Sequence, residues 1–475
     1  MTTPLPATLT DAAATDLAAA LRNKQISARD LMQAVLDRID ATNPAINAIV
    51  TLRPRDTLIA EAEAMDADPH PGPLAGLPIA VKDLVATKGM RTTYGSPVFS
   101  DHVPAADDLV AARLRAAGAI LIGKTNTPEW GHGSHSFNPI FGATRNPYDT
   151  TRTAGGSSGG AAAALAARML PLADGSDMMG SLRNPAAFCN VYGFRPSWGL
   201  VPPDAGGDTF LSTLATEGPM ARSPRDVALL LSALAGPNPE APFGRASEDF
   251  TARFGEELKG KRIGWLADWG GAYATEPGIL ETVEAALKVF EALGAIVEPV
   301  QAPYPAEKLW SSWITLRAAL NAGAKRDLAA DPAKRALTKP ESLWEIEQGQ
   351  GLSAEAVYEA SKTRSLWYRR AARLFETYDA LALPSAQVWP FPADWRWPEE
   401  IADRKMDTYH RWMEIVVPVS LAGLPCLGMP AGFSQSGLPM GMQLFGPTGS
   451  DAALLAMGDA YHQATDWPNA RPPTL

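Results

Sequence analysis

Three side chains of the 475-residue chain have neighbours that suit them to proton transfer: Lys82, Ser157 and Ser181. Lys82 directly follows the apolar run 77–81, which predicts a buried strand with the amine at its end. Burial disfavours the ammonium form, and a neutral amine can act as a base near neutral pH. A lone lysine is more often a solvated surface residue, so Lys82 gains meaning only from its combination with the serines.

The two serines lie in glycine-containing runs. Ser157 belongs to GGSSGG at 155–160, and Ser181 belongs to GSDMMGSLRNPA at 175–186. Glycine permits backbone conformations and close approaches that other residues disfavour, and successive amides of a turn can converge on an oxyanion. Either run alone is also compatible with an ordinary turn, and the first lacks the spacing of a phosphate-binding P-loop.

Composition argues against several classes of function. The chain has 42 Lys and Arg against 52 Asp and Glu, a net charge of −10 and no basic run, which disfavours nucleic acid as a partner. Cys189 and Cys426 form no CxxC pair, so buried thiols in a reducing cytoplasm are expected rather than disulfides or a zinc site. His132 and His135 lie three residues apart without a recognisable third ligand, which favours a polar loop over a metal site.

The sequence shows no targeting or membrane segment. The first residues, MTTPLPATLTDAAATD, have neither a basic leader nor an apolar core. The most apolar stretches, 161–173 and 416–433, are interrupted by Arg168 and by several prolines and glycines. A cytoplasmic protein with no membrane partner is therefore expected.

Short apolar runs alternate with amphipathic segments along much of the chain, which predicts an α/β protein with helices on both faces of a sheet. Without a clear linker, 1–475 is expected to form one domain, with 1–70 as N-terminal helices packed on it. Strands are predicted at 77–81, 119–122, 170–173, 262–266, 295–300 and 380–383, and helices twice in the first 50 residues and at 107–117, 159–167, 223–234 and 278–293.

Together these segments resemble the amidase signature family. The resemblance rests on the lysine strand, GGSSGG, the Ser181 run and a C-terminal signature: GLP at 423–425, PAG at 430–432 and GLPMGMQL at 437–444. Four motifs in this order cover most of the chain. The resemblance implies a single α/β/α domain with a large mixed central sheet, hydrolysis of a small-molecule carboxylic amide, and no cofactor. A homodimer is common in the family.

The resemblance also assigns roles to residues. It places the nucleophile on Ser181, the bridging serine, which follows a cis peptide bond, on Ser157, and the base on Lys82. The oxyanion would be received by four backbone amides and the site supported by four further side chains: respectively Met178, Met179, Gly180 and Ser181, and Ser158, Ser176, Asp177 and Arg183.

The sequence indicates the substrate less clearly than it indicates the reaction. Many family members carry glycine where this chain has Met179, so we hypothesise that Met179 affects specificity rather than catalysis itself. The tryptophan-rich region 300–400, its segment 389–397 above all, and the stretch 204–211 are predicted to form the pocket, with ordinary aromatic packing as the alternative. A hydrophobic or aryl amide is expected, while esters and carbamates stay open.

Three other interpretations compete. The run GGSSG at 155–159 matches the GxSxG nucleophile elbow, with Ser157 as nucleophile and His410 or His462 as base. An amidotransferase A-type subunit of the same family would use the same triad to release ammonia from glutamine. A catalytically silent binding protein on this fold would not need Lys82, Ser157 and Ser181 intact.

Overall fold

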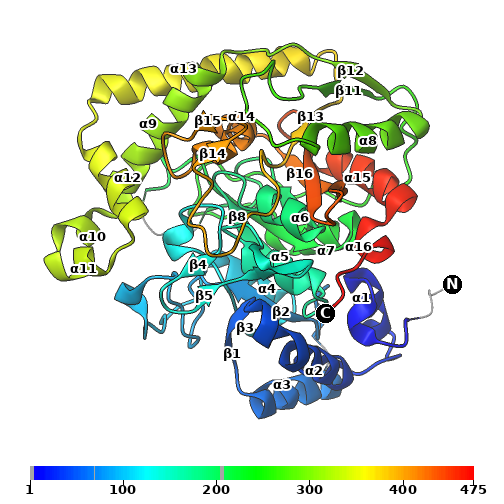
Figure 1. Ribbon diagram of the computed structural model, residues 1–475. Helices are drawn as coiled ribbons and strands as arrows, with labels where there is room; N and C mark the ends of the chain where they lie inside the picture. Colours follow the sequence, from blue (N-terminus) through cyan, green and yellow to red (C-terminus); the bar gives the residue numbers. More distant parts are fainter. Residues whose placement is uncertain (1–4, 69, 204–207) are drawn as a thin grey trace.

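A mixed sheet of eight strands forms the centre of the structure, a computed structural model that describes residues 5–68, 70–203 and 208–475 (Figure 1). β11 pairs in parallel with β12 and β13, and every other neighbouring pair is antiparallel. This mixed α/β architecture confirms the predicted fold class. In spatial order the strands are β12 (Ile296–Pro299), β11 (Arg262–Trp265), β13 (Ala380–Pro384), β17 (Pro439–Phe445), β16 (Cys426–Phe433), β9 (Tyr192–Arg195), β10 (Thr216–Ala221) and β8 (Leu172–Asp177).

Helices cover both faces of this sheet, as the neighbours Leu427 and Gly428 of β16 show. Successive strand residues point to opposite faces. Leu427 lies against Gly458 of α15 (Asp451–Thr465), whereas a Cβ on Gly428 would lie 2.9 Å from the Cα of Arg183, at the start of α6 (Arg183–Cys189). The glycine therefore lets α6, which follows the Ser181 run, lie directly on the sheet.

A smaller three-stranded sheet lies beside β8 and carries Lys82. Its order is β1 (Ile49–Leu52), β3 (Ile120–Thr125) and β2 (Pro78–Lys82), and β2 packs against β8. The helices α1 (Ala14–Arg22), α2 (Ala28–Ile46) and α3 (Arg55–Ala67) lie at this end of the molecule (blue in Figure 1). Ser27 caps α2 by accepting a 3.0 Å hydrogen bond from the Asp30 amide, as its capping-box position predicts.

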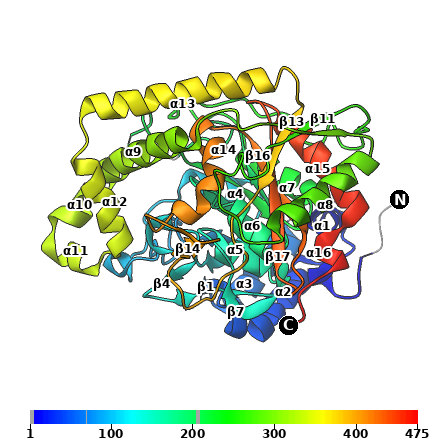
Figure 2. The same cartoon turned by 45° about the horizontal axis from the view of Figure 1, so that its top comes forward.

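A helical segment covers the opposite end of the molecule (Figure 2). Within it, α9 packs against both α12 and α13. Sequence periodicity did not predict these helices; in α13, for instance, only Ala360, Trp367 and Ala371 are buried. They are α9 (Ala306–Ala324), α10 (Arg326–Ala330), α11 (Pro332–Leu337), α12 (Pro340–Gln350) and α13 (Ala354–Leu374).

The predicted strands and helices are confirmed, with ends shifted by a few residues. Ser223, for instance, caps the predicted helix 223–234 by accepting a hydrogen bond from the Asp226 amide.

None of the helices in the described ranges combines the length and apolar character needed to cross a membrane. The remaining elements are α4 (Leu109–Ala116), α5 (Gly159–Ala166), α7 (Pro224–Leu234), α8 (Ile279–Ala292), α14 (Val417–Ala422), α16 (Trp467–Ala470) and the two-residue or edge strands β4 (Phe137–Asn138), β5 (Gly142–Ala143), β6 (Arg145–Asn146), β7 (Asp149–Thr153), β14 (Glu400–Ile401) and β15 (Arg404–Lys405).

Candidate active site

Lys82 lies fully buried at the end of β2 and contacts three serine hydroxyls. Its Nζ donates to Ser157 Oγ at 2.7 Å, Ser158 Oγ at 2.9 Å and Ser176 Oγ at 2.8 Å. An ammonium has three donors, and each has an acceptor here. Loss of one proton leaves a lone pair to which a hydroxyl can donate in return.

Burial lowers the pKa of Lys82 to about 8, against the opposing effect of nearby carboxylates, Glu217 first among them. A solvated lysine has a pKa near 10.4, so burial moves this amine towards the range in which a base operates at physiological pH. The arrangement can therefore both hold and release a proton next to Ser157.

Strand β8 holds the backbone of Lys82 in place. The Lys82 amide donates a 2.9 Å hydrogen bond to Asp174 Oδ1, and burial raises the pKa of Asp174 to about 6. Ser176 lies on the same strand, and the run that carries Ser181 follows it directly. One strand thus positions the lysine backbone, one hydroxyl that contacts its amine and the start of the Ser181 turn.

The GGSSGG loop is held by two serines that sequence reasoning missed. Ser134 Oγ donates to the Gly156 carbonyl at 2.6 Å, and Ser136 Oγ donates to the Ser157 carbonyl at 3.2 Å. The peptide bond between Gly156 and Ser157 is cis, as the family resemblance implies. No spacing signal links Ser134 and Ser136 to this loop, because the contacts depend on tertiary packing.

Asp177 organises the turn that presents Ser181. Its carboxylate accepts hydrogen bonds from the Gly180 amide at 2.9 Å and the Leu182 amide at 3.2 Å. Burial alone would raise the pKa of Asp177, but the guanidinium groups of Arg183 and Arg195 hold it well below its usual value. Arg183 was predicted as a support, whereas Arg195, on β9, was not.

Gly180 is required in this turn. Its φ is +80°, and a Cβ there would lie 2.1 Å from Asn184 Oδ1. Its amide was expected to receive an oxyanion, but that N–H already donates to Asp177, which corrects the expectation for this residue. Within the described ranges, the amides of Met178, Met179 and Ser181 donate to no acceptor, so three of the four expected donors remain.

Ser157 and Ser181 line one cavity of about 170 Å³, and their exposed fractions are 2% and 7%. Among the hydrogen bonds of the described residues, none joins the two hydroxyls directly. Catalytic hydrogen bonds in ligand-free enzymes are often long and tighten when substrate binds. Apolar side chains line part of this cavity: Leu84, Trp130, Met178, Met179 and Met413.

The helical segment supplies the other part of the lining, through polar residues. Arg317, Asn321 and Lys325, from α9 and its C-terminal end, face the cavity together with His132. The expectation that tryptophans of region 300–400 form this wall is not met: Trp313 and Trp367 are buried in the apolar core, and Trp389 lines a separate cavity. Of the stretch 204–211, residues 204–207 lie outside the described residues.

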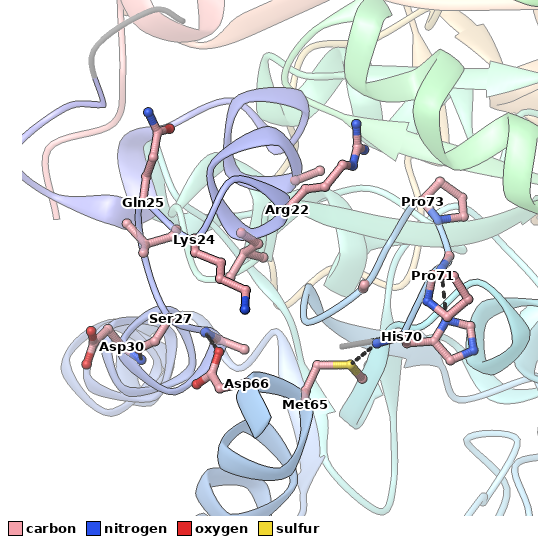
Figure 3. Close-up of a pocket in the computed structure, with 16 residues that line it drawn as sticks. Arg22, Lys24, Gln25, Ser27, Asp30, Met65, Asp66, His70, Pro71 and Pro73 are labelled. Carbon is pink, nitrogen blue, oxygen red and sulfur yellow. Dashed lines mark hydrogen bonds between the residues drawn. The ribbon is translucent and has the colours of Figure 1, made fainter. Parts of the chain in front are cut away.

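A larger cavity of about 550 Å³ lies among the N-terminal helices (Figure 3). Its walls include Arg22, Lys24, Asp66 and His70, and it shares no lining residue with the cavity that holds the serines. Size alone therefore does not identify the site. The smaller cavity is lined by Ser181 and by Ser157 and Ser176, whose hydroxyls contact the buried Lys82.

The histidines have other partners. His135 contacts Thr153 Oγ1 at 2.7 Å and the Ala393 carbonyl at 3.1 Å, and His462 lies near Tyr192 and Asp466. Neither His410 nor His462 lines the cavity with Ser157, which weakens the nucleophile-elbow interpretation. In the part of the chain that the structure describes, no group of three His, Cys, Asp or Glu residues could hold a metal ion.

Known proteins match nearly the whole length of the chain. The Amidase family model matches residues 30–455. The A subunit of the glutamyl-tRNA(Gln) amidotransferase of Thermus thermophilus is 38% identical, over 95% of this chain and 96% of that protein. A bacterial aryl acylamidase superposes with a TM-score of 0.89 at 29% identity, over 97% of this chain and 99% of the other. A 6-aminohexanoate cyclic dimer hydrolase superposes with a TM-score of 0.86 at 28% identity, over 98% and 99%.

The chain belongs to the amidase signature family. It is accordingly a hydrolase that acts on carboxylic amide C–N bonds.

Proposed function

We propose that the protein is a stand-alone amidase that cleaves a small amide through an acyl-enzyme on Ser181, with Ser157 as bridge and Lys82 as base. The observation that carries the proposal is the buried amine of Lys82, 2.7 Å from Ser157 Oγ, in a cavity that Ser157 shares with Ser181. A buried amine with a lowered pKa, in contact with hydroxyls, is the arrangement that serine activation needs.

In the proposed reaction, neutral Lys82 accepts the proton of Ser157 while Ser157 accepts the proton of Ser181. Ser181 Oγ attacks the amide carbonyl, and the amides of Met178, Met179 and Ser181 stabilise the oxyanion. The same chain of hydroxyls returns a proton to the departing amine, so the C–N bond breaks and an ester to Ser181 remains. Water then hydrolyses that ester by the same route in reverse order.

A second candidate function is release of ammonia from glutamine, because the A subunit of the Thermus thermophilus amidotransferase is 38% identical over nearly the whole chain. Such an activity would use the same three residues. The two functions differ in substrate and in dependence on partner subunits.

Hydrolysis of a panel of anilides, aliphatic amides, esters, carbamates and glutamine by the isolated chain tests the proposal. We expect release of amine from at least one small amide and its loss in Ser181→Ala. Turnover of glutamine alone would instead establish the second function, and unchanged turnover in Ser181→Ala would contradict the proposed mechanism.

A further inference from the structure

The cavity that Ser157 and Ser181 line also contains Lys325, a cation whose direct hydrogen-bond partners include no carboxylate. Lys325, at the C-terminal end of α9, donates to Asn321 Oδ1 and lies 3.1 Å from His132 Nε2. Both partners are uncharged amide or ring atoms. Among the ion pairs of the described residues, none includes Lys325.

Arg317 and the carboxylate of Glu217 also line this cavity. Arg317 pairs with Glu345 at 2.8 Å, and the electrostatic effect of Glu217 acts on Lys82. Glu345 also receives a hydrogen bond from Asn321, the residue that orients Lys325. Arg317 therefore has a carboxylate in direct contact, whereas Glu345 acts on Lys325 only electrostatically, without an ion pair.

The hydrogen bonds around Lys325 fix its orientation. Burial lowers the pKa of His132 well below its usual value, so the ring is neutral and Nε2 can accept from the Lys325 ammonium. His132 Nδ1 then donates to Ser342 Oγ, 2.8 Å away. This network engages two of the three ammonium donors and leaves one for a ligand.

Lys325 is charged at neutral pH. Burial lowers its pKa to about 8, which leaves roughly ten charged molecules for each neutral one at pH 7. A half-buried cation with no carboxylate in contact is costly, and an anion that contacts it in the cavity would reduce that cost. Its position at the end of α9 also complements the helix dipole, but this does not require the amine to face the cavity.

We infer that the substrate is an amide that carries a carboxylate, bound by Lys325 with Arg317 beside it while Ser181 attacks the amide carbonyl. This inference rests on the proposed function and narrows its substrate class. The cavity volume of about 170 Å³ favours a compact substrate in which the carboxylate and the scissile bond lie close together. The apolar side of the cavity would receive the uncharged part.

Two matched pairs of substrates test this inference and locate the carboxylate. Succinanilate and 4-methylpentananilide differ by a carboxylate on the acyl side, and hippurate and N-isobutylbenzamide differ by a carboxylate on the amine side. In each pair the neutral group is close in shape to the carboxylate. We expect a kcat/KM preference for the charged member of at least one pair, of about 10- to 100-fold.

Lys325→Met should remove that preference, because kcat/KM should fall more for the charged member of the pair than for the neutral member. Lys325→Arg should restore part of it, and Lys308→Met, an exposed lysine at the other end of α9, should leave it unchanged. Comparing ratios between variants cancels the intrinsic reactivity of each amide. Equal rates for both members of each pair, or a preference that survives Lys325→Met, would overturn the inference while the amidase proposal stands.

Binding to Ser181→Ala provides a test that does not depend on turnover. By calorimetry this variant should bind succinanilate or hippurate more tightly than the neutral counterpart, and addition of Lys325→Met should abolish the difference. No difference in affinity within either pair would refute carboxylate recognition even if no amide were hydrolysed. Tighter binding without hydrolysis in the wild-type protein would support recognition and count against the proposed function.

Discussion

Both walls of the active-site cavity are held by buried ion pairs, but the two pairs form over different distances in the chain. On the serine wall, Asp177 pairs with Arg183, six residues away, and with Arg195 on β9, which β10 separates from the strand of Asp177. On the helical wall, Arg317 pairs with Glu345 of the next long helix, and both also contact Tyr409. The Ser181 turn is therefore anchored by ion pairs to residues 6 and 18 positions away, and the helical wall by one between residues 28 positions apart.

We connect the serine wall with the chemical step and the helical wall with the choice of substrate. The nucleophile turn can be recognised from one run of sequence, because Asp177, which accepts hydrogen bonds from the turn, and Ser181, which the turn presents, both lie within that run. The helical wall has no such run, since its polar residues meet only after α9 and α12 have packed. We therefore expect disruption of the first wall to abolish turnover and disruption of the second to change substrate preference.

The largest expected effect is that of Ser181→Ala. Removal of the nucleophile should lower kcat by about 10⁴-fold or more, because the remaining groups stabilise the oxyanion without forming the acyl-enzyme. Steady-state hydrolysis of the best amide measures this, with Ser436→Ala, an exposed serine, as the matched control. Residual activity near that of the control would remove Ser181 from the mechanism.

Lys82→Ala should lower kcat/KM by about 10²- to 10⁴-fold, the usual range for loss of a general base. In the unchanged protein only neutral Lys82 is active, so kcat/KM should rise about tenfold per pH unit and level off above the pKa of about 8.

Lys124 is the control for that profile. It is a second buried lysine whose pKa burial lowers to about 8, but it donates to Thr87 and the Val85 carbonyl rather than to a serine. Lys124→Met should lower stability and keep the midpoint of the profile. If substitution of Lys124, and not of Lys82, moved the midpoint of the pH profile, Lys82 would not be the base.

Asp177→Asn should destabilise the fold by about 3–5 kcal/mol, because two buried guanidinium groups lose their counter-ion. Urea unfolding measures the change. Asp149→Asn, which removes an exposed partner of Arg152, should cost less than about 1 kcal/mol. Similar losses in the two variants would show that Asp177 does not anchor the turn.

On the helical wall, Glu345→Gln should raise KM about tenfold and leave the pH midpoint of Lys82 in place, because it disturbs Arg317 without touching the serines. Initial rates across pH on one amide separate these effects. A drop in kcat as large as that of Asp177→Asn would end the distinction between the two walls.

The smallest effect is expected from Met179→Gly. Met179 is buried and lines the cavity, and its φ lies outside the left-handed region, so its side chain fits without strain. Its removal should change relative rates among amides of different size by a few-fold, with the oxyanion amides preserved. Unchanged relative rates across such a panel would contradict a role in selectivity.

The sequence predicted the features of the molecule that depend on local order. The apolar runs and the helical periodicities led to the strands and the helices, whereas the candidate triad came from the resemblance of four motifs to the amidase signature family. It did not predict Ser134, Ser136 or Arg195, because nothing in their neighbourhoods indicates which loop or turn they hold. The oxyanion expectation for Gly180 did not anticipate that Asp177 takes its amide.

Tryptophan density was a poor guide to the pocket for a related reason. Large aromatic side chains bury area wherever packing allows, and here Trp313 and Trp367 lie in the core under α9 and α13. The residues that reach the cavity from this region, Arg317 and Lys325, are charged. Charged side chains are usually solvated, so only packing shows which of them turn inward.

The central claim is that Ser181, activated through Ser157 by Lys82, forms the covalent intermediate. Intact-mass analysis after treatment with phenylmethylsulfonyl fluoride, followed by peptide mapping, tests it most directly. We predict one adduct per chain, on Ser181, absent from Ser181→Ala and formed far more slowly in Lys82→Ala. An adduct on Ser157 in the unchanged protein, or labelling at the same rate without Lys82, would contradict this mechanism.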